Sequence, residues 1–282
     1  MSCVQASLDM KWVPSPWVFS GDSQYAWVKR GSDNDLLMFS LALLQVLYAY
    51  ESKGWPLLIQ VSGSVAVGKT TFAQHLMTTL KQLAPHWTYL ALSTDHFLKS
   101  NDELRLTCGL DRKGFPESYR DQQLQDFLEA FQNQNQSLPD IDQYSHEYYD
   151  HIPGLTQTLI CPNVLILEGV VALNPTCISQ QGIGLFIEAP LPCIKQWYIE
   201  RFMRLRDAAR DQSHHYFNRF AQQDLKTAQT IAEQTWCEVN LVNWYEHIMP
   251  TRDQAMCHLH KTEDHQWEAI HVPSHWPIRT MT

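Results

Sequence analysis

Positive charge is scarce in this sequence. It has 21 lysines and arginines against 30 acidic residues, so its formal net charge is −9. A general nucleic-acid-binding protein needs a basic surface that neutralises phosphates. The charge balance therefore argues against nucleic acid as a partner, although it leaves room for a local basic site.

Closely spaced cysteine pairs are also missing. The chain has seven cysteines, an odd number, and none belongs to a Cys-x-x-Cys pair. A disulfide framework or a structural zinc site needs paired or closely spaced cysteines. We therefore expect reduced thiols, as in a cytosolic protein.

Long apolar runs are lacking too. The most apolar stretch, residues 36–50, contains Ser40 and Gln45 and is shorter than the roughly 20 residues of a membrane span. The first residues show no basic segment followed by an apolar core, so we expect no signal peptide. These features predict a cytoplasmic protein with no membrane partner. They also predict a buried helix at 36–50, capped by Ser32 or Asp33.

A phosphate-binding motif is the strongest positive signal. An apolar run at residues 57–61 leads into GSVAVGKT at 63–70, which fits G-x-x-x-x-G-K-[ST], and an amphipathic helix is predicted over 69–83. Strand, glycine loop and helix are the context in which this motif binds phosphates, and that context disfavours a chance glycine turn. Backbone N–H groups of the loop and of the helix start would surround the anion. The predicted nucleotide-binding residues are Gly63, Ser64, Val65, Ala66, Val67, Gly68, Lys69, Thr70 and Thr71.

Two residues of this motif have specific expected partners. Lys69 can reach the β- and γ-phosphates of a nucleotide, and the Thr70 hydroxyl can ligate Mg²⁺. The sequence has no Asn-Lys-x-Asp motif for reading guanine, which argues against a GTPase switch.

Further strands predict the fold class. Short apolar runs at 88–92, 164–168 and 185–188 alternate with helical segments. This order predicts an α/β fold of the P-loop NTPase type, with a mainly parallel sheet flanked by helices on both faces. A hairpin is expected at 255–272, whereas residues 98–118 and 138–154 are expected to be loops.

The length suits one large α/β domain with insertions, or two small domains. The 282 residues include no linker that would split the chain. We expect residues 57–282 to form a single globular unit. Residues 1–56 would be a helical and irregular lead-in packed on it.

Two carboxylates stand at the carboxyl ends of predicted strands, where ligands bind in open parallel sheets. Asp95 could orient a substrate hydroxyl and accept its proton, or help to hold Mg²⁺. Glu168 could contact the metal through water. The alternatives are a turn-forming or helix-capping role for Asp95 and a carboxylate held by backbone amides for Glu168.

Other candidate side chains are less specific. Tyr144, His146 and Tyr149 could line a pocket for a small polar acceptor, although their residue types alone favour surface tyrosines packing over a sheet edge. Arg201 is one of several arginines on a predicted helix and could stabilise charge during phosphoryl transfer. The alternative is a solvated basic face, and composition cannot choose among the arginines. The histidine pairs at 214–215 and 258–260 could be metal ligands, but no third ligand follows at matching spacing, which argues against a metal site.

Seven motifs occur in one order along residues 57–272. They are GSVAVGKTT, STDHF, KGFPESY, YSHEYYD, LILEG, WYIERF and MPTR. Together they resemble bacterial type I pantothenate kinase, a P-loop kinase related to uridine kinase and phosphoribulokinase. KGFPESY and YSH, combined with the phosphate loop, are far more specific than any one motif.

The resemblance implies ATP-dependent phosphorylation of pantothenate to 4′-phosphopantothenate, the first step of coenzyme A biosynthesis. It implies that Lys69 and Thr70 serve ATP and Mg²⁺, that Asp95 is the general base, and that Arg201 binds the transferring phosphoryl group. It further implies a homodimer and feedback inhibition by coenzyme A. The implied pantothenate-binding residues are Asp95, Tyr144, His146, Tyr149, Tyr198 and Asn240.

The sequence departs from the family pattern at several positions. His96 stands where the family has glycine, so its side chain could narrow the acceptor site or change its charge. Glu200 replaces an asparagine, and the coenzyme A groove matches only in part. In that groove Phe202 and Phe217 fit, but Leu205 and Arg210 do not. Two alternatives stay open: a uridine-kinase-like kinase for another small hydroxyl acceptor, and a nucleotide-binding regulator without transfer activity.

Overall fold

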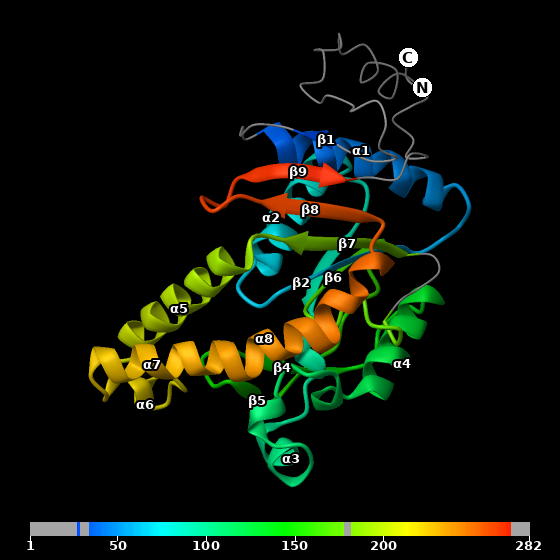
Figure 1. Ribbon diagram of the computed structural model, residues 1–282. Coiled ribbons are helices and arrows are strands. Elements are labelled where there is room, and N and C mark those ends of the chain that lie inside the picture. Colours follow the sequence, from blue (N-terminus) through cyan, green and yellow to red (C-terminus); the bar gives the residue numbers. More distant parts are fainter. Residues whose placement is uncertain (1–26, 29–33, 178–181, 272–282) are drawn as a thin grey trace.

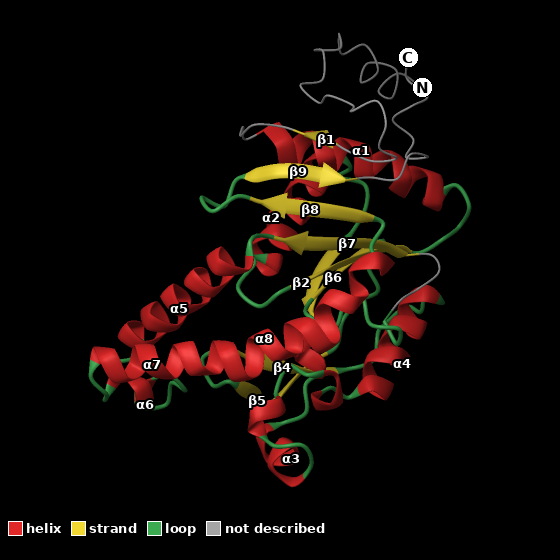
Figure 2. Ribbon diagram, in the orientation of Figure 1, coloured by secondary structure: helices red, strands yellow, loops and turns green. Residues whose placement is uncertain are grey.

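A central sheet organises the part of the chain that the computed structural model describes, residues 27–28, 34–177 and 182–271 (Figures 1 and 2). Its seven strands lie in the order β1-β9-β8-β7-β2-β6-β3. The strands are β1 (Trp27–Val28), β2 (Leu57–Gly63), β3 (Tyr89–Ser93), β6 (Val164–Glu168), β7 (Gly182–Glu188), β8 (Cys257–Lys261) and β9 (Trp267–His271). Most of the predicted lead-in and its cap at Ser32 or Asp33 lie outside the described residues.

The five strands from β8 to β3 are parallel, and β9 and β1 add an antiparallel edge. Strand β6 lies between β2 and β3, so Glu168 pairs in register with Val61 on one side and Ser93 on the other. The ends of three strands therefore meet at one edge of the sheet. The hairpin predicted at the C-terminal side is confirmed for β8 and β9, and its last position, 272, lies outside the described residues.

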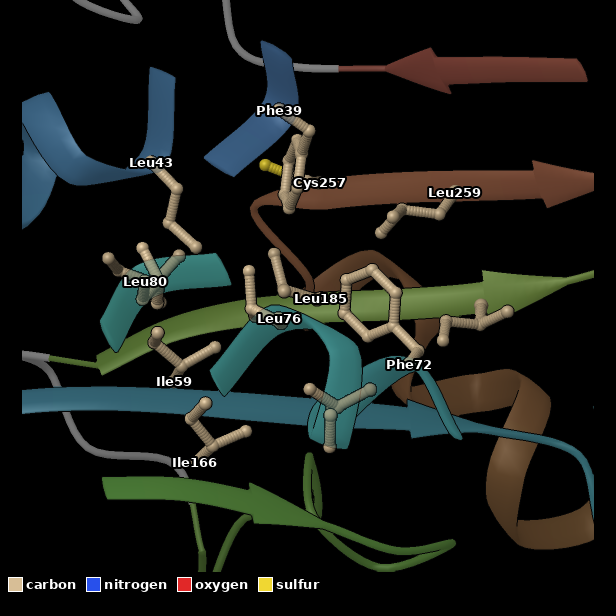
Figure 3. Packing of buried hydrophobic residues seen from close by; sticks show 14 of the residues in the cluster. Phe39, Leu43, Ile59, Phe72, Leu76, Leu80, Ile166, Leu185, Cys257 and Leu259 are labelled. Carbon is tan, nitrogen blue, oxygen red and sulfur yellow. The ribbon is translucent and has the colours of Figure 1, made fainter. Parts of the chain in front are cut away.

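Helices cover both faces of the sheet, so the predicted fold class is confirmed. On one face Ile59, Ile166 and Leu185 pack against α1 (Asn34–Glu51) and α2 (Lys69–Leu83) (Figure 3). Alternate strand residues point the other way and pack against α4 (Asp121–Gln132). Each fully buried leucine or isoleucine contributes about 1.5–3 kcal/mol. Within the described residues, no helix is both long and apolar enough to cross a bilayer.

A long helical excursion follows β7. Figure 1 shows α5 (Leu191–Ala208) running away from the sheet, and the segment from α7 (Leu225–Thr235) to α8 (Leu241–Asn243) running back. A short helix, α6 (Asn218–Ala221), joins the two. The returning segment contains two π-helical turns, at 236–240 and 244–248, a geometry often found at functional sites.

Both segments predicted to be loops contain regular structure, and those two predictions are wrong. Residues 98–118 include α3 (Asn101–Leu106), whose start carries a capping box between Ser100 and Glu103. Residues 138–154 include most of a two-stranded hairpin, β4 (Ile141–Ser145) and β5 (Asp150–Gln157). Ile141 is the one buried residue of these two strands, so the hairpin lacks the apolar run that reveals a buried strand.

Candidate active site

The phosphate loop joins β2 to α2 and has the backbone of an anion cradle. Gly63, Ala66 and Gly68 have positive φ angles of 147°, 64° and 94°. Such conformations turn successive N–H groups toward one point. A methyl group on Gly63 would lie 2.3 Å from the carbonyl oxygen of Ile187, so only glycine fits there.

Lys69 lies buried at the start of α2. Its Nζ donates to the carbonyl oxygens of Gly63, at 3.1 Å, and Ser64, at 2.9 Å. Burial lowers the pKa of Lys69, while the carboxylates of Glu168 and Asp95 act against that shift. The buried Ser64 hydroxyl has no hydrogen-bond partner among the described residues. These donors fit the phosphates of a nucleotide.

Thr70, at the start of α2, and Glu168, at the end of β6, lie next to each other beside the phosphate loop. The Thr70 hydroxyl donates to Glu168 Oε1 at 2.8 Å. Burial raises the pKa of Glu168, and Lys69 opposes that shift. Hydroxyl and carboxylate oxygens are the protein ligands that Mg²⁺ accepts, so the two residues fit the metal role predicted for them.

Asp95 stands at the end of β3, in a 3₁₀ turn at 94–97. The turn is fixed by a bond from the Asp95 backbone N–H to the Ser93 hydroxyl, at 3.2 Å. The carboxylate is partly exposed, and its Oδ2 lies 3.9 Å from His146 Nε2. The fold thus brings Asp95 toward Lys69 and Glu168 on one side and toward the β4–β5 hairpin on the other.

The predicted acceptor residues come from the hairpin and from the helical excursion. The Tyr144 ring lies edge-on to His146 at 5.4 Å, and Tyr149 stacks on Tyr216 at 4.1 Å between ring centroids. Burial raises the pKa of Tyr198. The Asn240 amide nitrogen is buried with no hydrogen-bond partner of its own in the described chain, so a donor is available for a ligand.

The structure distinguishes the arginines that the sequence left equivalent. Arg201 is partly exposed, and its charge lowers the pKa of Lys69, an effect smaller than those of burial and of the Glu168 and Asp95 carboxylates. Arg206 is buried and donates to the carbonyl oxygens of Phe220 and Gln223, a structural role. Arg204 and Arg210 are exposed.

Lys113 is a site residue that sequence reasoning missed. Its buried Nζ donates to Tyr149 O at 2.6 Å and to Asn101 Oδ1 at 2.7 Å. Burial lowers the pKa of Lys113 to about 8, although the carboxylates of Asp150 and Asp95 oppose the shift. Its only sequence signal was its position in the KGFPESY motif.

Lys261 is the second residue missed. It ends β8, is 8% exposed, and donates to the carbonyl oxygen of Val67 in the phosphate loop at 3.1 Å. Its Nζ lies 4.7 Å from the centroid of the Trp267 ring, and burial lowers its pKa to about 8. A lysine that ends an alternating strand pattern was the available signal.

The residues that depart from the family pattern have defined contacts. His96 does not simply fill the acceptor site: its Nδ1 lies 3.2 Å from the Tyr144 nitrogen and 3.1 Å from the Asp142 carbonyl oxygen. Glu200 accepts a hydrogen bond from Gln196, one turn earlier on α5, at 2.8 Å.

Comparison with known proteins decides the family. No family model matches the sequence. Over 225 residues the chain is 40% identical to a Streptococcus thermophilus protein named pantothenate kinase, and the match covers 77% of this chain and 72% of that protein. The chain belongs to the pantothenate kinase family. A pantothenate kinase of Lactococcus lactis subsp. cremoris is 38% identical over 223 residues, with the same coverage of both chains.

Solved structures agree with this fold. The structure of the YGR205w protein matches with a TM-score of 0.61 and 13% sequence identity, and it covers 84% of this chain and 98% of that one. At such low identity the likeness supports the architecture alone. Membership of the pantothenate kinase family therefore rests on the sequence relatives.

Proposed function

We propose that this protein phosphorylates pantothenate with ATP, giving 4′-phosphopantothenate and ADP as the first step of coenzyme A biosynthesis. Its relationship to named pantothenate kinases, at 40% identity over 77% of the chain, carries the proposal. The arrangement of charged groups around the phosphate loop supports it. A cytoplasmic location is part of the proposal.

The nucleotide would be held at the start of α2. Backbone N–H groups of the phosphate loop and the Lys69 ammonium would bind the triphosphate, and Lys261 adds a second cation beside the loop. Thr70 would ligate Mg²⁺, with Glu168 reaching it through water. When bound, the metal offsets negative charge on the phosphates.

Transfer would proceed between this loop and the hairpin. Asp95 would accept the proton of the pantothenate primary hydroxyl as its oxygen bonds to the γ-phosphorus. The bond between that phosphorus and the oxygen bridging to the β-phosphate breaks, and ADP leaves. Arg201 would stabilise the negative charge on the phosphoryl group during its transfer. Positioning and charge stabilisation supply most of the catalysis.

The acceptor would lie against the hairpin. Tyr144, His146 and Tyr149 approach from it, while Tyr198 and Asn240 approach from the helical excursion. The unpartnered Asn240 amide and the buried Lys113 ammonium offer polar contacts to a small anion with hydroxyl and amide groups. These contacts support pantothenate as the acceptor.

Two further properties belong to the proposal. Feedback inhibition by coenzyme A is supported by an aromatic cluster next to the Tyr149–Tyr216 stack, in which Phe202 lies 5.2 Å from Phe217 and 4.9 Å from Phe220. A homodimer is supported by the family relationship. Inhibition assays and sedimentation at several protein concentrations test these two properties.

Replacing Asp95 with asparagine tests the reaction. Turnover of pantothenate should fall by about 10²–10⁴-fold, the usual contribution of a general base, while ATP binding by calorimetry is unchanged. Asp126→Asn, at an exposed position on α4, is the matched control. Near-normal turnover in Asp95→Asn would remove that residue from its role. Preference for a nucleoside over pantothenate in the wild-type protein would contradict the substrate.

A further inference from the structure

The imidazole of His96 bridges the turn that carries Asp95 and the hairpin that carries the acceptor residues. His96 directly follows Asp95 in the 3₁₀ turn at 94–97. Its Nδ1 lies 3.2 Å from the backbone nitrogen of Tyr144 and 3.1 Å from the carbonyl oxygen of Asp142. Both of these atoms belong to β4. A side chain next to the carboxylate therefore contacts the backbone of the strand opposite.

The contact falls where the hairpin ladder is irregular. The pairing of β4 with β5 shifts between Asp142 and Tyr144. Such a bulge disrupts the ladder locally and re-aims neighbouring side chains. Because His96 binds at the shift, it constrains where Tyr144 points. Tyr144 in turn packs edge-on to His146, whose Nε2 lies 3.9 Å from Asp95 Oδ2.

Other contacts hold the hairpin at different places. His151 Nε2 lies 2.6 Å from the Leu98 carbonyl oxygen, and Lys113 Nζ lies 2.6 Å from the Tyr149 carbonyl oxygen. Arg120 binds the Asp142 carboxylate at 2.8 Å. These contacts anchor β5, the turn and the edge of β4. The His96 contact differs because it starts from the residue adjacent to Asp95, so it sets the separation between carboxylate and pocket most directly.

We propose that His96 is a positioning residue that fixes the β4–β5 hairpin relative to Asp95 and so sets acceptor affinity. The inference rests on the proposed function, because the hairpin matters only if it binds the acceptor. With Nε2 protonated, Nδ1 accepts a hydrogen bond from the Tyr144 backbone N–H; with Nδ1 protonated, it donates to the Asp142 carbonyl oxygen instead, and either bond holds β4. The imidazole's hydrogen-bond contacts are with β4 and not, within the described residues, with the phosphate loop or the groups expected to bind the metal.

His96→Leu and His96→Asn form the test pair. Leucine fills similar space without a polar atom, whereas the asparagine Oδ1 can take the place of Nδ1 as an acceptor. Loss of one hydrogen bond should raise the KM for pantothenate about 3- to 10-fold in His96→Leu. The KM for ATP should change less than about 2-fold, because the phosphate loop is not involved. His96→Asn should restore most of the acceptor KM, and His75→Leu, at an exposed position on α2, should match the wild type.

The measurements are steady-state kinetics, ATP calorimetry and thermal unfolding of each variant. A selective rise in the pantothenate KM, reversed by asparagine, supports the positioning role. An unchanged KM in His96→Leu overturns it. An equal defect in both variants, or a parallel rise in the ATP KM with a lower unfolding temperature, also overturns it, because the effect would then be general destabilisation. If the wild-type protein does not phosphorylate pantothenate, the proposed function fails first and by itself.

Discussion

The charge of Lys261 should lower the stability of the nucleotide-free protein and increase its affinity for the nucleotide. Its ammonium is almost fully buried between the phosphate loop and Trp267, and burial lowers its pKa from 10.5 to about 8. This lowering of the pKa corresponds to about 3.5 kcal/mol, because a tenfold change in an equilibrium constant is worth about 1.4 kcal/mol. At neutral pH the charged lysine therefore costs the free protein about that much relative to its neutral form.

The sign of the pH dependence follows from proton binding. Between pH 8 and 10.5 the unfolded chain keeps the proton on this lysine and the folded chain loses it. Stability therefore rises with pH across that window and is insensitive to this group below it. Lys261→Met keeps the stem and removes the charge. From pH 7.5 to 9.5 the wild type should gain about 2 kcal/mol relative to this variant.

Urea unfolding at several pH values measures this difference. Comparison of wild type with variant cancels the other groups that titrate in the same range, and Lys226→Met, at an exposed position, is the control. The variant should also bind ATP about 10-fold or more weakly at pH 7.5, as expected when a charge-assisted contact is lost. Stability curves that stay parallel between pH 7.5 and 9.5 would refute the reasoning, because the lysine would then not be held in a desolvated site.

Two other substitutions test the residues at the end of β7 and in the phosphate loop. Burial alone would raise the pKa of Glu188, but hydrogen bonds from His260 and Arg252 lower it to about 2. The ionised carboxylate therefore stabilises the folded protein above pH 4.5, and this stabilisation is lost as the pH falls toward 2. Glu188→Gln removes this carboxylate and should abolish about 3 kcal/mol of the stability that the wild type loses on acidification. Acid unfolding curves of wild type and variant that superimpose would contradict this. Gly63→Ala should cost about 2 kcal/mol or more and abolish ATP binding, because its methyl group would lie 2.3 Å from a carbonyl oxygen. At Gly54 a methyl group meets nothing within 4 Å, although φ is +68°. Gly54→Ala should therefore lose some stability yet retain ATP binding, so calorimetry separates the two variants.

The phosphate loop and the class of fold follow from local patterns in the sequence. Residues 57–83 contain strand, loop and helix without interruption, and helix α2 begins and ends at the predicted residues, Lys69 and Leu83. Such a signal is local, because glycine placement and helical periodicity act over a few residues. Strands β6 and β7 were visible for the same reason: they are buried and mostly apolar on both faces, as a parallel sheet covered by helices requires. The strand predicted at 88–92 is instead the edge strand β3, in which Leu92 is the one buried residue.

Which polar groups meet depends on strand order and helix packing, and local patterns do not show it. The insertion of β6 between β2 and β3 places Glu168 beside Thr70, and the exposed hairpin brings His146 to Asp95. Lys113 and Lys261 come from distant segments, and each looked like an ordinary surface lysine in the sequence. Arg201 and Arg206 share one helix, yet Arg206 is buried and bound to backbone carbonyl oxygens, whereas Arg201 is partly exposed. Hydrophobic periodicity can be read from neighbouring residues, but the sequence around a charged residue does not indicate its partner. Contacts between side chains far apart in the chain therefore become known only when strand order and helix packing are known.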